Sequence, residues 1–131
     1  MTNNFFSNFF INIEKKGNNE RDLINSIEEV FPNKSDKVLD VLNKGIFKYI
    51  YKPSNRSIWI ALGEKCEHII YPKLYCSCQD FYKSVVIKRK RVFCKHILAQ
   101  IISEALRLYQ EIELDDAEFK KLINDLELEY K

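Results

Sequence analysis

The chain has 131 residues, of which 46% are hydrophobic, and a formal net charge of +2. This length suits one domain of ordinary size. So small a net charge excludes both a polycation that must bind nucleic acid and an acidic, disordered tail. The charge is unevenly distributed: residues 1–72 carry ten basic and nine acidic side chains, residues 73–95 carry seven and one, and residues 104–131 carry four and nine. The middle of the chain is therefore basic and its end is acidic.

The chain starts with the apolar stretch MTNNFFSNFFINI. This stretch lacks a positive flank and a small-residue cleavage site, and polar residues interrupt it well before the length of a bilayer span. We therefore expect no targeting signal and no membrane partner. The expected location is the cytoplasm, with association to the nucleoid, or the nucleus if the source is eukaryotic.

Aromatic residues within this start recur at helical spacing. They are Phe5, Phe6, Phe9 and Phe10, followed by Ile13. Such a stripe suits two purposes equally well: it can bind a partner protein, or it can pack on the chain's own core. Both alternatives stay open at the level of the sequence.

Two short helices are predicted next. Asn19 is placed to cap the first, which stops at Pro32, and Ser35 is placed to cap the second, which ends near Gly45. Their apolar positions at helical spacing are Leu23, Ile24, Ile27, Val30 and Phe31 in the first and Val38, Leu39, Val41 and Leu42 in the second. One face of each helix is therefore expected to be buried.

A small antiparallel sheet is predicted after these helices. The segments IFKYIYK and SIWIAL are rich in aromatic and β-branched residues and flank the turn-like PSNR, a pattern typical of a hairpin. Gly63 then turns the chain into a third strand near residues 66–71.

Two more helices complete the predicted elements. A wide apolar stripe at helical period indicates a core helix, formed by Ile97, Leu98, Ile101, Ile102, Ala105, Leu106, Tyr109 and Ile112. Asp115 and Glu118 resemble a capping box at the start of a last helix, in which Phe119, Leu122, Ile123 and Leu126 form one apolar face. Helices, a small sheet and further helices in this order predict the α+β class.

The residues that carry chemistry lie in the segment YCSCQDFYKSVVIKRKRVFCKHILAQ, residues 75–100. In an extended segment Cys76 and Cys78 point to the same side. Cys94 and His96 stand at the start of the apolar core helix and can also face together. Three thiolates and one imidazole form a closed tetrahedral set typical of one structural zinc ion, with no position left for a substrate or a water molecule. Tight pairs of this kind suit a shared metal better than disulfides in a reducing compartment.

Cys66 and His68 form a rival pair with the same one-residue gap. The chain has four cysteines and two histidines, so two complete four-ligand sites cannot be built from them. We favour the set of Cys76, Cys78, Cys94 and His96 because its second half opens a helix, and we interpret the rival pair as ordinary strand residues. Whether that pair substitutes in the metal site stays open.

Basic side chains lie in or beside the loop that would enclose the metal: Lys83, Lys88, Arg89, Lys90, Arg91 and Lys95. Three thiolates around a dication leave a charge of about −1, which these cations compensate. The same run, with Tyr82 and Phe93 nearby, also fits contacts to a nucleic-acid backbone, where cations neutralise phosphates and rings stack on bases. The other interpretation is a solvated basic loop beside an anionic zinc site.

The spacing C-S-C, fifteen residues and C-K-H-I-L-A resembles the SWIM zinc-binding domain, whose pattern is C-x-C followed by C-x-H. The resemblance implies that Cys76, Cys78, Cys94 and His96 bind the metal. The extension to Ala99 resembles the C-x-H-x-x-A form of the SWIM subunit in Shu-type complexes, which assist RecA-like recombinases in homologous recombination. A small side chain there would let the zinc loop pack closely; equally, alanine is a good helix former in a core helix.

The resemblance covers residues 56–105 and says little about the first 45 residues or the last helix. We expect three segments in one compact unit: an N-terminal helical segment (1–45), a SWIM zinc-finger domain (46–112) and a C-terminal helix (113–131). Many SWIM modules are appended to helicase-like, transposase-like or ubiquitin-ligase-like proteins, whereas this chain has no P-loop and no pattern of a catalytic acidic triad. A stand-alone SWIM chain is thus expected to be an accessory subunit. The Lys-, Ile- and Asn-rich composition suits an archaeal or other AT-rich genome.

Two functions follow from these expectations. The first is a zinc-stabilised adaptor that binds RecA-like recombinase paralogues in recombination and DNA repair. The alternative is a nucleic-acid-binding zinc module that contacts the backbone without reading sequence, in transcription or other DNA transactions. We expect no enzyme activity and no small-molecule substrate, because a Cys-Cys-Cys-His set offers no open metal position and His68 would be the only remaining imidazole for proton transfer.

Overall fold

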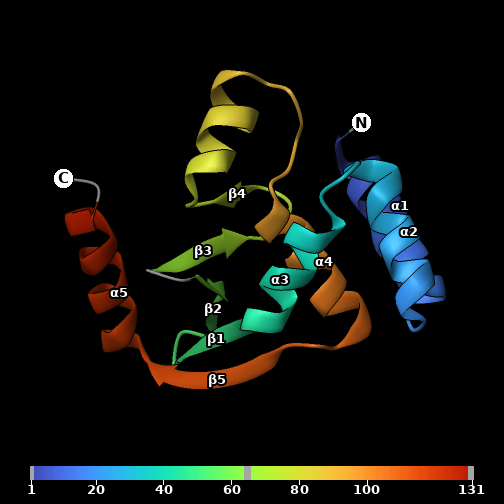
Figure 1. Cartoon of the computed structure of the whole chain (residues 1–131). Helices are drawn as coiled ribbons and strands as arrows, with labels where there is room; N and C mark the ends of the chain where they lie inside the picture. Colours follow the sequence, from blue (N-terminus) through green and yellow to red (C-terminus); the bar gives the residue numbers. More distant parts are fainter. Residues whose placement is uncertain (1, 64–65, 130–131) are drawn as a thin grey trace.

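The computed structural model describes residues 2–63 and 66–129, with side chains described for residues 5–63 and 66–124. In chain order its elements are α1 (Thr2–Lys16), α2 (Glu20–Val30), α3 (Ser35–Lys44), β1 (Ile46–Lys52), β2 (Arg56–Leu62), β3 (Glu67–Tyr71), β4 (Tyr75–Cys76), the π-helical segment η1 (Phe81–Ile87), α4 (Lys95–Leu106), β5 (Gln110–Asp115) and α5 (Asp116–Glu129). Helices and one mixed sheet confirm the predicted α+β class (Figure 1).

The predicted helices before the sheet are present, but one of them is capped differently. Asn19 caps α2 as predicted, because its side chain accepts a hydrogen bond of 2.9 Å from the Arg21 amide. Ser35 is the first residue of α3 and does not cap it. The carboxylate of Glu28 in α2 takes that role, accepting bonds from the amides of Asn33 (2.9 Å) and Ser35 (3.0 Å). A residue from the preceding helix therefore fixes the turn between α2 and α3.

The strands form one sheet in the order β4-β3-β2-β1-β5. The predicted hairpin of β1 and β2 and the third strand β3 are confirmed, and these strands pair antiparallel. In the hairpin Lys48 lies opposite Trp59, with its ammonium group 5.6 Å from the centre of the Trp59 ring. The two-residue strand β4 lies at one edge, next to β3, and carries the first of the predicted metal ligands.

The prediction of a helix that continues to Ile112 is wrong. Helix α4 ends at Leu106, where Arg107 adopts a left-handed conformation with φ of 56°. The chain then forms β5, which pairs parallel with β1. Residues 111–115 alternate acidic and apolar side chains, a period of two that is typical of a strand and that a search for helical spacing overlooks. The side chain of Asp116, just beyond, accepts a hydrogen bond of 2.7 Å from the Ser54 hydroxyl and so fixes α5 to the hairpin turn.

Each face of the sheet is covered by helices (Figure 1). Helices α1–α4 lie on one side, where the main core cluster joins Phe6 and Ile27 with Trp59 and Ile101. Helix α5 lies on the other side, where a smaller cluster is built on Tyr51 and neighbouring strand residues. Burial raises the pKa of Tyr51 to about 12, with the charges of Tyr49 and Glu118 adding to the effect. The predicted segments 1–45 and 46–112 thus share one core cluster.

The phenylalanines of α1 point mainly into this core. Phe6 and Phe9 are buried, and Phe5 and Phe10 are half-buried against the same cluster. The aromatic stripe therefore packs on the chain's own core, and part of Phe5 and Phe10 stays accessible. Neither α1 nor any other helix in the described part of the chain combines the length and apolar character needed to cross a membrane.

Replacement of Ile13 by Ala tests whether α1 is part of the core. Ile13 has no exposed surface, whereas Ile11 on the same helix is 46% exposed. We expect Ile13→Ala to lower the free energy of unfolding by about 2–5 kcal/mol, and Ile11→Ala to change it by less than about 0.5 kcal/mol. Urea denaturation of the zinc-loaded chain measures both values. Equal losses in the two variants would contradict the observed packing of α1.

The carboxylate of Glu28 is expected to stabilise the fold in a pH-dependent way. Hydrogen bonds from the Asn33 and Ser35 amides lower its pKa below the ordinary 4.5. Its contribution is therefore present above pH 4.5 and is lost as the pH falls through the lowered pKa. Glu28→Gln should melt at a lower temperature than the wild type at neutral pH, and this difference should shrink on acidification. The neighbouring Glu29→Gln is the control, and a pH-independent difference would refute the assignment.

Candidate metal centre

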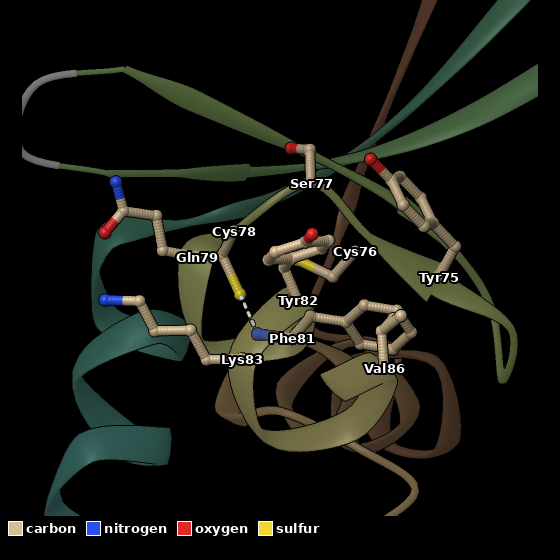
Figure 2. Close-up of a pocket in the computed structure, with 9 residues that line it drawn as sticks. All are labelled: Tyr75, Cys76, Ser77, Cys78, Gln79, Phe81, Tyr82, Lys83 and Val86. Atoms are coloured by element: carbon tan, nitrogen blue, oxygen red, sulfur yellow. Dashed lines mark hydrogen bonds between the residues drawn. The ribbon is translucent and has the colours of Figure 1, made fainter. Parts of the chain in front are cut away.

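Cys76 and Cys78 are held in position by the residue between them. The Ser77 amide donates to the Ile69 carbonyl (3.0 Å), and the Ser77 hydroxyl accepts from the Ile69 amide (2.9 Å). The segment is therefore tied to β3 and stays extended beyond β4. Because side chains alternate along an extended chain, both cysteines lie opposite Ser77; Figure 2 shows the Cys78 sulfur pointing away from the Ser77 hydroxyl.

Cys94 and His96 are placed by the start of α4. Cys94 is the N-cap residue, with an extended backbone (φ −117°, ψ 175°), and His96 belongs to the first turn. The sulfur of Cys94 lies 3.9 Å from Nδ1 of His96. The change from extended to helical backbone between these residues turns both ligand atoms toward the same point.

The four predicted ligands meet at one site. Cys76, Cys78, Cys94 and His96 are all buried, and their ligand atoms all lie within 4.8 Å of one another. In a tetrahedral zinc site with ordinary Zn–S and Zn–N distances, neighbouring ligand atoms lie about 3.6–3.8 Å apart. A small inward movement of the four side chains would bring their ligand atoms to this spacing. The described residues thus fit zinc in number, type and spacing, and three thiolates with one imidazole are the ligands of a closed structural site.

The three thiols alter one another's ionisation. Burial raises the pKa of Cys94 to about 12. The contact with Cys78 raises the pKa of Cys76, whereas the hydrogen bonds that Cys78 accepts from Cys76 and Cys94 lower its own pKa. Protein groups alone therefore favour a single thiolate in this cluster. A dication is needed to hold all three sulfurs as thiolates.

The rival pair lies beside the cluster rather than in it. Cys66 is exposed, and the His68 ring is 4.4 Å from the His96 ring, centre to centre, at an angle of 42°. Burial lowers the pKa of His68, and the charge of His96 lowers it further. Within the described ranges, the group close enough to share an ion consists of Cys76, Cys78, Cys94 and His96. The His68 ring thus lies against one side of the His96 ring.

The loop between the two halves of the site is fixed by Asp80 and Arg91. The guanidinium group of Arg91 donates to both carboxylate oxygens of Asp80 (2.6 and 2.7 Å) and to the Phe93 carbonyl (3.0 Å), and it lies 4.9 Å from the centre of the Phe31 ring. The Phe81 amide at the start of η1 donates to the Cys78 sulfur (3.3 Å). Sequence inspection missed this ion pair, although Asp80 is the one acidic residue among residues 73–95.

The other predicted site residues fall into two groups. Lys83, Lys88, Arg89 and Lys90 are exposed on η1 and the following turn, and Lys95 is half-buried at the start of α4. Ala99 has no exposed surface and belongs to the main core cluster.

Phe93 also connects the metal-binding loop to the N-terminal helices, and sequence inspection missed this role. Its buried ring stacks on Phe5 (5.4 Å between centres, 8° between planes) and meets Phe31 edge-on (5.2 Å, 85°). Phe93 is therefore engaged within the core rather than exposed for stacking on a base. The residue before Cys94 thereby connects the metal site to α1 and α2.

Loss of one buried thiol is expected to abolish zinc retention. Cys78→Ser removes a ligand from a closed set of four and leaves buried polar groups without their cation, so the purified variant should contain almost no zinc and should melt at a lower temperature. Cys66→Ser is the matched control and should keep the zinc content of the wild type. Elemental analysis after gel filtration measures both, and a Cys66→Ser variant without zinc would show that the rival pair contributes a ligand.

Comparison with known proteins agrees with this site. No family model matches the chain, and no solved structure matches it. The chain is 32% identical over 104 residues to Zinc finger SWIM domain-containing protein 7 of Mus musculus (78% of this chain, 68% of the mouse protein) and 31% identical over 100 residues to the protein of that name in Homo sapiens (75% and 71%).

A third relative extends the comparison beyond animals. It is the Zinc finger SWIM domain-containing protein 7 homolog of Dictyostelium discoideum, 34% identical over 92 residues. The match spans 68% of this chain but only 59% of the Dictyostelium protein. With these similarities and a buried Cys₃His cluster at the C-x-C and C-x-H positions, the chain belongs to the Zinc finger SWIM domain-containing protein 7 family.

Proposed function

We propose that this chain is a zinc-stabilised SWIM adaptor that binds RecA-like recombinase paralogues and assists homologous recombination and DNA repair, as the SWIM subunit of Shu-type complexes does. The observation that carries the proposal is the buried Cys₃His cluster in a chain of the SWIM domain-containing protein 7 family. The additional match at Ala99, three residues after His96, supports the Shu-type form of the motif.

Cys76, Cys78, Cys94 and His96 hold one structural zinc ion per chain in this proposal. When bound, zinc supplies the positive charge that keeps the three sulfurs ionised and joins the end of β4 to the start of α4. Its binding free energy then becomes folding free energy for the segment 73–99. Loss of zinc would therefore disturb partner binding through the fold.

An adaptor fits these residues better than an enzyme does. The four protein ligands complete the tetrahedral set of zinc and leave no position at which a substrate or a reactive water would bind. The remaining imidazole, His68, lies against His96, and burial lowers its pKa. We therefore assign no catalytic residue.

Nucleic-acid binding is the second candidate function. It is favoured by the exposure of Lys83, Lys88, Arg89 and Lys90 on η1 and the following turn. Because Arg91 is paired with Asp80, the proposed contact surface is smaller than the sequence suggested. Contacts of these side chains would be to phosphates, would carry no sequence preference and would weaken as salt is added.

We propose the cytoplasm, close to the chromosome, or the nucleus of a eukaryotic cell, as the place where such an adaptor works. The relatives named above are eukaryotic proteins. The archaeal or AT-rich source suggested by the composition stays a prediction.

Recovery of the chain from its own cells tests the adaptor function. The tagged chain is purified with nuclease treatment, its companions are identified by mass spectrometry, and zinc is quantified on the same sample. We expect RecA-like ATPases in stoichiometric amounts and about one zinc per chain. The Cys66→Ser chain is the matched control and should recover the same companions.

Two results would contradict the adaptor function. Recovery of the zinc-loaded chain without any ATPase would count against it directly. Recovery of nucleic acid alone, lost on nuclease treatment and reduced when Lys88, Arg89 and Lys90 are changed to Gln, would favour the second candidate function.

A further inference from the structure

Exposed apolar side chains gather around one part of the metal-binding segment. In the described part of the chain, nine large hydrophobic side chains are exposed, and seven of them lie between Tyr71 and Val92. They belong to the β3–β4 hairpin, to η1 and to the turn after it. Scattered single apolar residues are normal on a protein surface, whereas a contiguous group marks an interaction site.

A groove runs through this group beside the metal site (Figure 2). We call it the apolar groove; it is lined mainly by Tyr75, Cys76, Phe81, Tyr82, Lys83 and Val86 and has a volume of about 470 Å³. This volume lies in the range of about 300–1,000 Å³ that is usual for binding pockets. It is large enough to accept a bulky side chain.

The base of the apolar groove is buried and its rim is accessible. Cys76 and Phe81 are buried, and the Phe81 ring meets the Tyr75 ring edge-on at 5.5 Å. The rim consists of Tyr75, Tyr82 and Val86, which are 44%, 60% and 48% exposed. A preformed base with an exposed apolar rim is suited to binding, because little conformational entropy is lost when the ligand enters.

The surroundings of the apolar groove are positively charged. Lys83 lines it directly, and Lys88, Arg89 and Lys90 are exposed just beyond η1. The nearby carboxylate of Asp80 does not offset them, because it is paired with Arg91. The charge of about −1 on a zinc-loaded site, whose ligands Cys76 and Cys78 also line the groove, offsets only one of these four cations. Charge complementarity therefore favours a ligand that carries negative charge beside an apolar anchor.

We propose that the apolar groove binds a short amphipathic segment of a partner protein, with an aromatic or long aliphatic anchor side chain flanked by Asp or Glu. An anchor buried in a small pocket and surrounded by complementary charges is the usual arrangement of a peptide-binding hot spot. This proposal rests on the adaptor function only in taking the partner to be a protein, and not on the identity of that partner.

Single-stranded nucleic acid is disfavoured by the shape of the site. Bases stack on the open faces of aromatic rings arranged along a charged channel. Here Phe81 is 5% exposed and forms part of the base of a concave pocket, and Val86 contributes aliphatic surface. Such a lining recognises an apolar side chain better than a series of bases.

Selection of peptides on the zinc-loaded full chain tests the proposal. A displayed library of short random peptides is enriched on the chain, and the selected peptides are synthesised with a fluorophore and titrated by anisotropy. We expect enriched sequences with Leu, Phe or Trp beside Asp or Glu. Val86→Asp and Lys83→Glu should each weaken their binding about tenfold or more, with zinc content and melting temperature unchanged because both side chains are exposed.

Matched controls separate the apolar groove from a general loss of apolar or basic surface. Leu108→Asp changes an exposed apolar residue outside the groove, and Lys120→Glu changes an exposed lysine on α5. Both should bind the selected peptides as the wild type does. Equal weakening in Leu108→Asp and Val86→Asp would overturn the proposal.

Other results would also overturn it. These are a library that yields no sequence preferring the wild type over Val86→Asp, a selection of basic peptides, and a labelled oligothymidylate that binds more tightly than any peptide and depends on Tyr82. The adaptor function is judged separately: a Val86→Asp chain that no longer binds the selected peptides but recovers RecA-like ATPases at wild-type levels would support both functions and show that the ATPases bind elsewhere. If the chain binds the selected peptides but recovers no ATPase, the groove proposal is supported and the adaptor function is contradicted.

Discussion

The fold depends on bringing three sulfurs and one imidazole together in its interior. The donors come from β4, from the extended segment just after it and from the start of α4, and their ligand atoms lie within 4.8 Å of one another. Without a cation, burial and mutual contact keep the pKa values of Cys76 and Cys94 high, so these two thiols stay protonated. When zinc is bound, the same grouping becomes a source of folding free energy and connects the sheet edge to the central helix.

A second set of contacts holds the loop that closes this site. Arg91 bridges the Asp80 carboxylate, the Phe93 carbonyl and the Phe31 ring, so one side chain connects the loop to α2. The buried ring of Phe93 stacks on Phe5 of α1. The N-terminal helices therefore pack directly against the metal-binding loop. Their stability and that of the zinc site are linked, because they share the same core cluster.

These contacts use several of the side chains that the sequence predicted for partner or nucleic-acid binding. The phenylalanine stripe of α1 is mostly used in the core, and one of the basic side chains of the loop is used in an ion pair. Tyrosines, aliphatic side chains and cations stay exposed on the β3–β4 hairpin, on η1 and on the turn after it. The Cys78 sulfur accepts a hydrogen bond from the first amide of η1. The geometry of this surface is thus coupled to the metal site beneath it.

The sequence by itself determined the metal cluster, the helices before the sheet and the antiparallel hairpin, because these depend on local spacing: C-x-C on an extended chain, C-x-H at a helix start, caps and apolar periodicity. It also favoured Cys76, Cys78, Cys94 and His96 over Cys66 and His68. Only the tertiary structure decided that residues 110–115 form a strand. The spacing of Tyr109 and Ile112 also fits a helix, and it is the pairing with β1 that supplies the hydrogen bonds of a strand. The roles of Glu28, Arg91 and Phe93 were likewise decided there, because each depends on a tertiary contact that local spacing does not reveal.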